Sequence, residues 1–353
     1  MDAEKIFSGT VEPSGADVLD GDSLAAWMTT HVEGFCGPLT IRKFAGGQSN
    51  PTYRLDTPAS AYVLRRKPFG PLLPSAHAVD REYRVIAALH PTGFPVARPH
   101  GLCQDDSVIG SMFYVMAMVE GRTIWNGAMP DASIEQRRAT YLAMVDTLAA
   151  LHNVDHEAVG LGDYGKPGNY FARQVERWTK QYRLSETETM ADMEALIAFL
   201  PATLPEQTRT SIVHGDYRID NMIFDQNDPR VLAVLDWELS TLGDPLSDFA
   251  YMCMAWVTPN EKRSGVMDLD RKALGIPELE EVVERYCAAT ARDGVPDLNW
   301  YLAFNFFRLA GIVQGIKKRV IDGTASSAHA REMAEKVDML AQAAHHFAKL
   351  AGA

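Results

Sequence analysis

Three polar side chains within residues 211–238 have types and spacing that suit metal-assisted chemistry. Asp216 and Asn221 lie five residues apart in a polar turn, and Asp236 follows the apolar segment VLAVL. The apolar strands MIF and VLAVL would form a hairpin that gathers the three side chains in one small volume. Asp and Asn oxygens suit Mg²⁺, which takes further ligands from water and phosphates. An acid left over can accept a proton from a hydroxyl, which is what phosphoryl transfer to an alcohol requires.

The elements that must position these residues differ between the two parts of the chain. The first 120 residues have β-branched or aromatic segments separated by turn residues, and residues 1–20 read as a loose arm. Later residues show the apolar spacing of long amphipathic helices. The expected strands cover 39–45, 52–57, 61–68, 101–106 and 111–120, and the expected helices cover 22–35, 75–90, 133–152, 170–183, 188–200, 300–321 and 329–350.

This pattern predicts an α+β protein with two lobes. Residues 1–119 would form a small antiparallel sheet lobe that binds a nucleotide. Residues 120–353 would form a larger, mainly helical lobe that carries the polar turns. A length of 353 residues is ample for two such units.

The charge balance narrows the classes of partner. With 34 basic and 46 acidic residues the formal net charge is −12. Broad neutralisation of nucleic-acid phosphates and docking on an anionic membrane are therefore not expected. A nucleotide substrate remains compatible, because one local cationic site with metal ions can offset phosphate charge.

Cysteine usage and the N-terminus indicate a cytoplasmic protein. The four cysteines are far apart in sequence and form no C-x-x-C pair, so reduced, buried thiols are expected. The first 22 residues are acidic and lack the apolar core of a signal peptide. No run approaches the roughly 18 apolar residues of a membrane helix.

The motif HGDYRIDN, followed about fifteen residues later by Asp236, resembles the protein-kinase-like fold and, within it, the aminoglycoside phosphotransferase and choline kinase family. The resemblance implies that Asp216 is the catalytic base and that Asn221 and Asp236 bind Mg²⁺. It also implies that Asp248, in LGDPLSDFA, braces the backbone of the catalytic loop. His214 would fix the conformation of that loop.

The same resemblance assigns the nucleotide site to the first lobe. Alternation along the strand YVLRRKP puts Val63 and Arg65 on one face. Val63 would cover the adenine of ATP, and Arg65 would reach its phosphates in place of the usual lysine. Glu82, on the following helix, would pair with Arg65, and it is preferred to Asp80 because REY matches the family.

Two further segments complete the expected ATP site. GGQSNPTY lies where the phosphate-covering hairpin of the family should be, and its glycines permit close backbone approach. FYVMAMVEG resembles the strand that leads into the hinge. The residues implied by these segments are Gly46, Gly47 and Ser49 for the phosphates, Met116 as gatekeeper, and the backbone from Ala117 to Val119 for the adenine edge.

A narrower resemblance concerns the acceptor. The set GGQSNPTY, VLRRKP, GRTIW, HGDYRIDN and DWELSTLGDP is similar to the phosphotransferase domain found fused to certain acyl-CoA dehydrogenases, which implies hydroxyacyl thioesters among the acceptors. The acceptor pocket is expected between the catalytic loop and C-terminal helices that include residues 299–315. That stretch is rich in apolar residues and poor in acids, which favours a small, partly apolar hydroxyl compound over a polycationic antibiotic.

Several alternatives stay open from the sequence. Arg218 either neutralises the γ-phosphate or is a surface arginine paired with Asp220, and Glu238 is expected to be structural. The function could also be that of an antibiotic kinase or of an inactive, nucleotide-binding relative, for which the arginine at 65 is the single support. The HGD loop and the lack of an A-P-E segment disfavour a protein kinase.

The stretch GLGDYGKP, residues 160–167, satisfies two phosphate-binding patterns, G-x-G-x-x-G and G-x-x-x-x-G-K. Pro167 stands where a P-loop has a hydroxyl, and no strand leads into Gly160. We therefore predict a loop in the helical lobe. A functional Lys166 would be expected on the acceptor side of the cleft.

Overall fold

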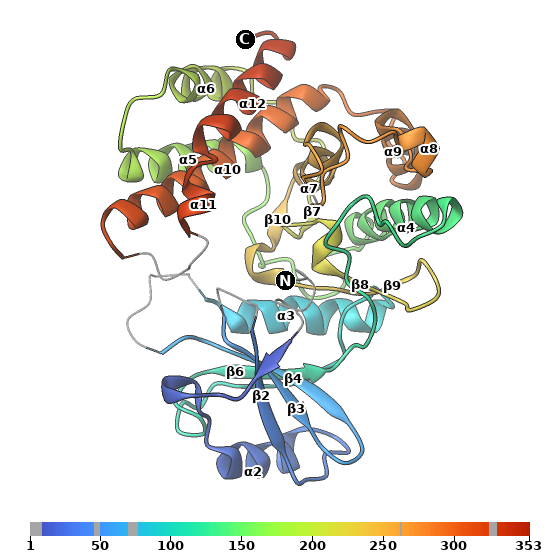
Figure 1. The fold of residues 1–353 in the computed structure, drawn as a ribbon, viewed down its shortest axis with the longest axis vertical. Helices are drawn as coiled ribbons and strands as arrows, with labels where there is room; N and C mark the ends of the chain where they lie inside the picture. The colour runs from blue at the N-terminus through green and yellow to red at the C-terminus, as the bar shows by residue number, and fades with distance from the viewer. Residues whose placement is uncertain (1–8, 46–49, 70–76, 262, 325–329) are drawn as a thin grey trace.

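The computed structural model describes residues 9–45, 50–69, 77–261, 263–324 and 330–353. The chain forms two lobes, with a sheet lobe below and a helical lobe above in Figure 1. No helix in the described ranges combines the length and the apolar composition needed to span a lipid bilayer.

The small lobe is one antiparallel sheet of six strands in the order β1-β2-β3-β4-β6-β5. Residues 9–20 contribute to it, which corrects the expectation of a loose arm. Thr10 pairs with Phe44, and Val11 pairs with Lys43. A two-residue edge strand has no alternation long enough to be predicted from sequence. The strands are β1 Thr10–Val11, β2 Thr40–Phe44, β3 Thr52–Asp56, β4 Ala61–Arg66, β5 Pro99–Cys103 and β6 Phe113–Ala117.

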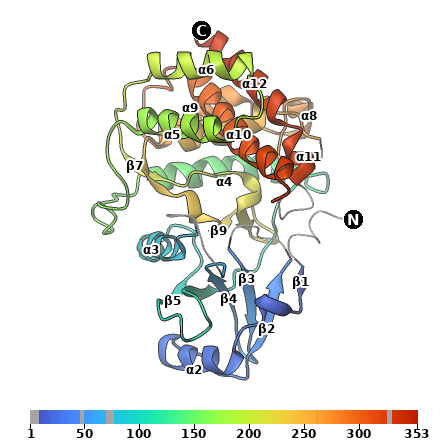
Figure 2. The ribbon, with the colours of Figure 1, turned by 90° about the vertical axis from the view of Figure 1, so that its left-hand side faces the viewer.

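Two helices cover opposite faces of this sheet. Helix α2 (Gly21–His31) begins after Asp20, whose carboxylate caps the Ser23 N–H, and its buried side chains join Leu64 and other residues of one face in a core. Helix α3 (Val79–Leu89) lies on the other side, between the sheet and the helical lobe (Figure 2). The alternation of β4 therefore directs Leu64 toward α2 and Arg65 toward α3.

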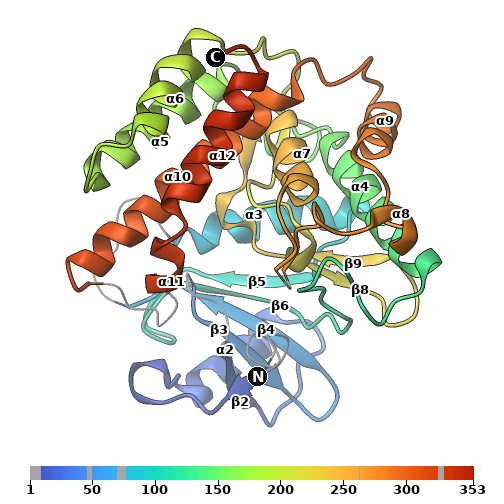
Figure 3. The same cartoon turned by 45° about the horizontal axis from the view of Figure 1, so that its top comes forward.

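The large lobe is built around α10 (Leu298–Ile321), which packs against α5, α7 and α12. Figure 3 shows α10 and α12 side by side. The expected helix over 329–350 is two helices, because a turn at Lys336 separates them. The other helices are α4 Ile134–His152, α5 Tyr170–Ser185, α6 Ala191–Ala202, α7 Leu246–Cys253, α8 Arg271–Leu274, α9 Leu279–Ala289, α11 Ala330–Ala334 and α12 Val337–Leu350.

Two short antiparallel pairs hold the polar turns at the junction of the lobes. Strand β7 (Ser211–Val213) pairs with β10 (Thr241–Gly243), and β8 (Met222–Phe224) pairs with β9 (Val231–Val234). The predicted hairpin of MIF with VLAVL is therefore present. The predicted boundary at 119/120 lies in the segment between β6 and α4, which pairs with β8 through Arg122 and Phe224.

Candidate active site

The Asp248 carboxylate of α7 binds the backbone of the loop that follows β7. The carboxylate accepts the His214 N–H at 2.5 Å and the Gly215 N–H at 2.8 Å. Burial alone would raise the pKa of Asp248, but the interaction with His152, whose Nε2 lies 3.5 Å away, outweighs it and the pKa is lowered. The predicted bracing role of Asp248 is confirmed by these contacts.

His214 ties the same loop to the strand that ends at Asp236. Its Nδ1 accepts the Asp216 N–H at 3.1 Å, so the proton sits on Nε2, which lies 2.8 Å from the Leu235 carbonyl oxygen. Gly215 has a φ of +86°, and a Cβ there would lie 2.8 Å from the Leu239 carbonyl oxygen. Only glycine meets both conditions, which explains the G of HGD.

The Asp216 carboxylate is fixed by two neutral donors. Its Oδ1 accepts the Tyr251 hydroxyl at 2.7 Å, and its Oδ2 accepts the Asn221 amide at 2.8 Å. The side chain keeps 20% of its surface exposed. A carboxylate that is oriented yet reachable can accept a proton from a bound hydroxyl.

A backbone hydrogen bond brings Asn221 close to Asp236. The N–H of Leu235, the residue before Asp236, donates to the Asn221 carbonyl at 2.8 Å. The Asn221 amide nitrogen binds Asp216, which turns its side-chain oxygen outward as an acceptor. Asp236 has a φ of +64° and carries its carboxylate into the cleft. Within the described ranges no three His, Cys, Asp or Glu side chains gather as a metal cage. Two oxygen donors fit a Mg²⁺ ion that shares its shell with phosphates and water.

Arg65 joins the sheet lobe to this turn. Its guanidinium lies 3.2 Å from Glu82 and 2.7 Å from Asp236, and only 13% of the side chain is exposed. It also lies 3.7 Å from Glu238, which was expected to be structural. Burial opposes the charge, yet the surrounding acids raise the pKa of Arg65, so the group stays cationic.

Glu82 is the buried partner of this arginine. Only 1% of it is exposed, and it accepts the Asn50 amide at 2.7 Å and the Tyr114 hydroxyl at 3.1 Å. Burial raises the pKa of Glu82, although Arg65 acts against the shift. The other acid of this helix, Asp80, instead lies 3.8 Å from Lys67. The structure thus brings Arg65 and Glu82 together, as the family resemblance implied.

The residues predicted to meet adenine lie on adjacent strands. Val63 of β4 pairs with Met116 of β6. The Ala117 N–H donates to the Arg98 carbonyl and the Met118 N–H donates to the Ala61 carbonyl, so both of these N–H groups are already hydrogen-bonded within the small lobe. The predicted phosphate-covering residues Gly46, Gly47 and Ser49 lie outside the described residues.

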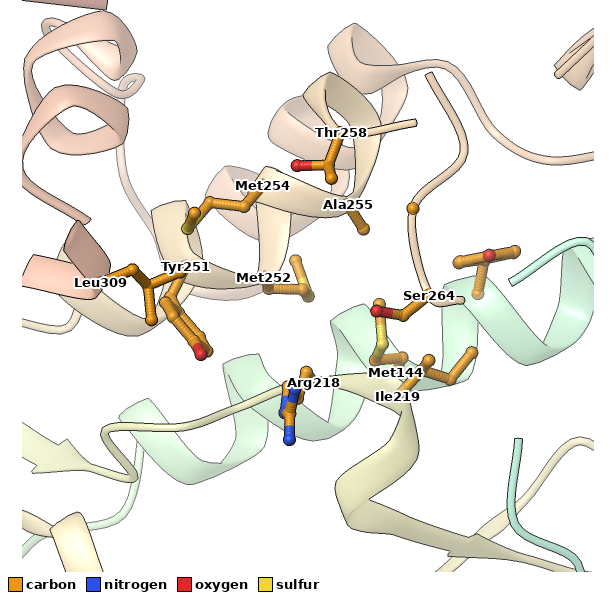
Figure 4. Close-up of a pocket in the computed structure, with 12 residues that line it drawn as sticks. Met144, Arg218, Ile219, Tyr251, Met252, Met254, Ala255, Thr258, Ser264 and Leu309 are labelled. Carbon is orange, nitrogen blue, oxygen red and sulfur yellow. The ribbon is translucent and has the colours of Figure 1, made fainter. Parts of the chain in front are cut away.

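A pocket of about 160 Å³ is lined in part by Tyr251 and Arg218 (Figure 4), the two residues that contact the Asp216 carboxylate at 2.7 Å and 3.4 Å. The wall comes from the loop after β7, from α4, from α7 with the segment that follows it, and from α10. The lining contains three methionines, two tyrosines and one arginine, and none of the lining residues is acidic. The lining residues are Tyr141, Met144, Arg218, Ile219, Tyr251, Met252, Met254, Ala255, Thr258, Ser264, Gly265 and Leu309.

Residues 40–296 match the phosphotransferase enzyme family, and this range contains Arg65, Glu82 and both polar turns. The chain belongs to this family. A putative aminoglycoside phosphotransferase from Ralstonia eutropha is 51% identical to it, with a TM-score of 0.87 and coverage of 94% of this chain and 99% of that one.

Longer relatives contain a matching segment. Mouse acyl-CoA dehydrogenase family member 10 is 45% identical over 90% of this phosphotransferase, and human member 11 is 40% identical over 92%. The chain spans 30% of the length of the first and 42% of the second. An aminoglycoside phosphotransferase in complex with AMP-PNP and hygromycin B has a TM-score of 0.59 at 16% identity, which shows a shared fold.

In this phosphotransferase, Arg218 combines features of both alternatives that the sequence left open. Its guanidinium lies 3.4 Å from Asp216 and 3.4 Å from Asp220, and 45% of the side chain is exposed. It also lines the pocket. Arg218 is therefore a cation at the pocket mouth, next to the candidate base, rather than a surface residue paired with Asp220 alone.

Residues 299–315, which the sequence predicts to contribute to an acceptor pocket, contribute little to the pocket in Figure 4. Leu309 is the one residue of α10 in the lining, whereas Trp300, Phe304 and Phe307 are buried in the core of the lobe. Sequence reasoning missed the residues that do form the wall. The sequence feature that could have identified them is the methionine-rich segment YMCMAW, residues 251–256, which directly follows DFA.

The stretch GLGDYGKP of the phosphotransferase is a loop between α4 and α5, as predicted. Lys166 is exposed and does not line the pocket, so its expected place on the acceptor side is not supported. Leu161 and Tyr164 of this loop are buried.

Proposed function

We propose that this protein is an ATP- and Mg²⁺-dependent phosphotransferase that moves the γ-phosphate of ATP to a hydroxyl of a small molecule. The observation that carries the proposal is the position of Asp216. Its carboxylate is held by Asn221 and by Tyr251, which lines the pocket, while Asn221 is joined to the residue before Asp236 by a backbone hydrogen bond. The Asn221 amide thus serves both parts of the site. Its nitrogen donates to Asp216, the proton acceptor, and its oxygen would bind the metal together with Asp236.

The proposed reaction follows from these positions. Asp216 takes the proton of the acceptor O–H as the acceptor oxygen forms a bond to the γ-phosphorus. The bond from the γ-phosphorus to the β–γ bridging oxygen breaks, and ADP leaves with its electron pair. Asn221 and Asp236 would hold Mg²⁺, which neutralises phosphate charge when bound. Arg218, at the pocket mouth, would offset charge on the transferred group.

Arg65 would hold the α- and β-phosphates. In the structure its guanidinium is bound to Asp236, so nucleotide binding must exchange this ion pair for contacts to phosphate and metal. An arginine is suited to this exchange because its planar fork binds phosphates bidentately. Val63, Met116, Ala117 and Val119 would enclose the adenine, and Gly46, Gly47 and Ser49 would cover the phosphates.

For the acceptor we propose a partly apolar hydroxyl compound, of which a hydroxyacyl metabolite is one example. The methionine-rich, acid-free lining supports this, because a polycationic aminoglycoside needs carboxylates in its pocket. The match to acyl-CoA dehydrogenase family members 10 and 11 agrees with an acyl-type acceptor. An antibiotic acceptor is the alternative, favoured by the similarity to the putative aminoglycoside phosphotransferase from Ralstonia eutropha.

The test is an acceptor screen that follows ADP release from Mg·ATP. Hydroxyacyl compounds of increasing chain length form one arm, and kanamycin-type aminoglycosides form the other. Turnover of the hydroxyacyl arm supports the proposed acceptor class. Turnover of aminoglycosides alone would favour the antibiotic kinase, and nucleotide binding without any turnover would favour an inactive relative.

A further inference from the structure

The loop GLGDYGKP contacts two elements of the candidate site through one buried side chain. The Tyr164 hydroxyl lies 3.1 Å from the Arg81 carbonyl oxygen and 2.7 Å from Ser240 Oγ. The Arg81 guanidinium donates to the Tyr164 carbonyl at 2.6 Å and lies 4.2 Å from the centre of its ring. Only 1% of Tyr164 is exposed, so its hydroxyl and ring are shielded from solvent although Arg81 itself is exposed.

The loop is seated by close packing rather than by a ligand. A Cβ on Gly165 would lie 2.5 Å from Thr241 Oγ1 and 2.6 Å from the Leu242 nitrogen. Glycine at this position therefore lets the loop backbone rest on β10. Of the three glycines in the phosphate-binding pattern, Gly165 has this packing role, which places the neighbouring Tyr164 between the lobes.

The two partners of Tyr164 are neighbours of the site. Arg81 precedes Glu82 in α3, and Ser240 lies four residues after Asp236. The Tyr164 hydroxyl donates to the Arg81 carbonyl, so the Ser240 hydroxyl is the donor in its contact with Tyr164. Ser240 Oγ also lies 2.5 Å from the Trp237 carbonyl oxygen, which is the alternative acceptor for its proton on the side of Asp236. Tyr164 thus connects α3 to the Asp236 turn, as the Arg65–Asp236 ion pair does through Glu82.

The two connections differ in what a nucleotide would do to them. On the proposed function, Arg65 moves to the phosphates and Asp236 to the metal, so their direct contact opens. The Tyr164 contacts use no group that the nucleotide or the metal would take. We infer that Tyr164 is a positioning residue, which keeps α3 in place relative to the Asp236 turn while nucleotide is bound. Because Glu82 of α3 contacts Arg65 of β4, the position of α3 also sets that of the Arg65 guanidinium.

Arg84 of α3 also contacts the loop, but its ion pair does not fix the position of α3. Arg84 pairs with Asp163, but their side chains are 41% and 79% exposed. Exposed ion pairs are weak and contribute little to geometry. The inference therefore concerns the buried hydroxyl of Tyr164 and not the charges around it.

The experiment removes that hydroxyl alone and rests on the proposed function for its ligand. Tyr164→Phe keeps the ring and its stacking with Arg81. Tyr53→Phe is the matched control, because Tyr53 is also buried and donates to the Asp17 carbonyl at 3.0 Å, within the small lobe. Lys166→Ala controls for the exposed part of the same loop.

Binding of Mg·AMP-PNP is measured by calorimetry, together with thermal unfolding without nucleotide. We expect Tyr164→Phe to weaken binding about threefold to tenfold, the range for one lost buried hydrogen bond. Tyr53→Phe should unfold at a similarly lowered temperature yet bind as the wild type does, and Lys166→Ala should change neither. Ser240→Ala should weaken binding by a similar factor. The double variant Tyr164→Phe/Ser240→Ala should bind Mg·AMP-PNP little more weakly than either single variant.

Three results would overturn the inference. Wild-type affinity in Tyr164→Phe would show that the hydroxyl does not position the site. Equal weakening in Tyr53→Phe would reduce the effect to general stability. A wild-type protein that binds no Mg·AMP-PNP would overturn the proposed function and this inference together, which distinguishes that failure from the other two.

Discussion

Arg65 of the sheet lobe binds Asp236 of the helical lobe at 2.7 Å, although 171 positions separate them in the chain. Glu82 contacts the Nε atom of the same guanidinium at 3.2 Å. Because nucleotide would displace Asp236 but not Glu82, Glu82 keeps the cation that would hold the phosphates oriented before and after nucleotide arrives. This preorganisation reduces the conformational entropy that binding would otherwise cost.

Replacing this arginine should damage both folding and binding. Arg65→Met leaves the buried Glu82 carboxylate without its cation, which should lower the free energy of unfolding by about 3 kcal/mol. It should also weaken Mg·AMP-PNP binding at least tenfold, and Arg65→Lys should recover part of both. Denaturant unfolding and calorimetry measure the two effects. Wild-type affinity in Arg65→Met would contradict a phosphate-binding role.

The Tyr251 hydroxyl should matter for turnover more than for nucleotide affinity. Tyr251→Phe removes one of the two neutral donors that orient Asp216, so kcat should fall about threefold to tenfold while KM for ATP stays constant. Tyr141→Phe is the control, because Tyr141 lines the same pocket but donates to the Gly127 carbonyl. Equal losses in the two variants would show that the effect comes from the pocket wall.

The fold of the catalytic loop can be tested with two glycines. Gly215→Ala combines a φ of +86° with a Cβ only 2.8 Å from the Leu239 carbonyl oxygen, whereas Gly160 has a φ of +77° and open space around it. Gly160→Ala should lower the free energy of unfolding by about 1 kcal/mol through backbone strain alone. Gly215→Ala should lower it by clearly more, because the clash is added to the strain. Similar unfolding free energies would argue against the close approach at Gly215.

Much of the site could be predicted because its residues are close in sequence. HGDYRIDN sets Asp216 and Asn221 five residues apart, and period-two alternation along β4 separates Arg65 from Leu64. Such local patterns need no knowledge of tertiary packing. They led to the α+β fold and the hairpin, whereas the Arg65–Glu82 pair came from the family resemblance.

What could not be predicted depends on contacts between distant segments. The aromatic residues of α10 look alike in sequence whether they face a core or a pocket, and the structure buries most of them. Tyr251 and Tyr164 carry no motif, and each acquires its contacts from segments at least 35 residues away. The helices between residues 246 and 289 are short, so their periodicity is weak.

Stability should depend on pH through Asp244, which lies outside the candidate site. Burial raises its pKa to about 6, and its Oδ1 accepts the Leu246 N–H at 2.9 Å. A raised pKa favours the protonated form in the folded state, so this contribution is complete below about pH 4 and is lost as the pH rises through 6. Asp244→Asn should therefore gain stability relative to the wild type between pH 5 and 7.5. Thermal unfolding across this range checks it, and a constant difference would contradict it.

The most direct test of the proposed function is phosphoryl transfer from Mg·ATP to the acceptor found in the screen, measured for the wild type and for Asp216→Asn. Asparagine preserves the size of the side chain but cannot take the proton of the hydroxyl. We predict a loss of about a hundredfold or more in kcat, with Mg·AMP-PNP affinity unchanged. Transfer at the wild-type rate by Asp216→Asn would contradict the assignment of Asp216 as the base.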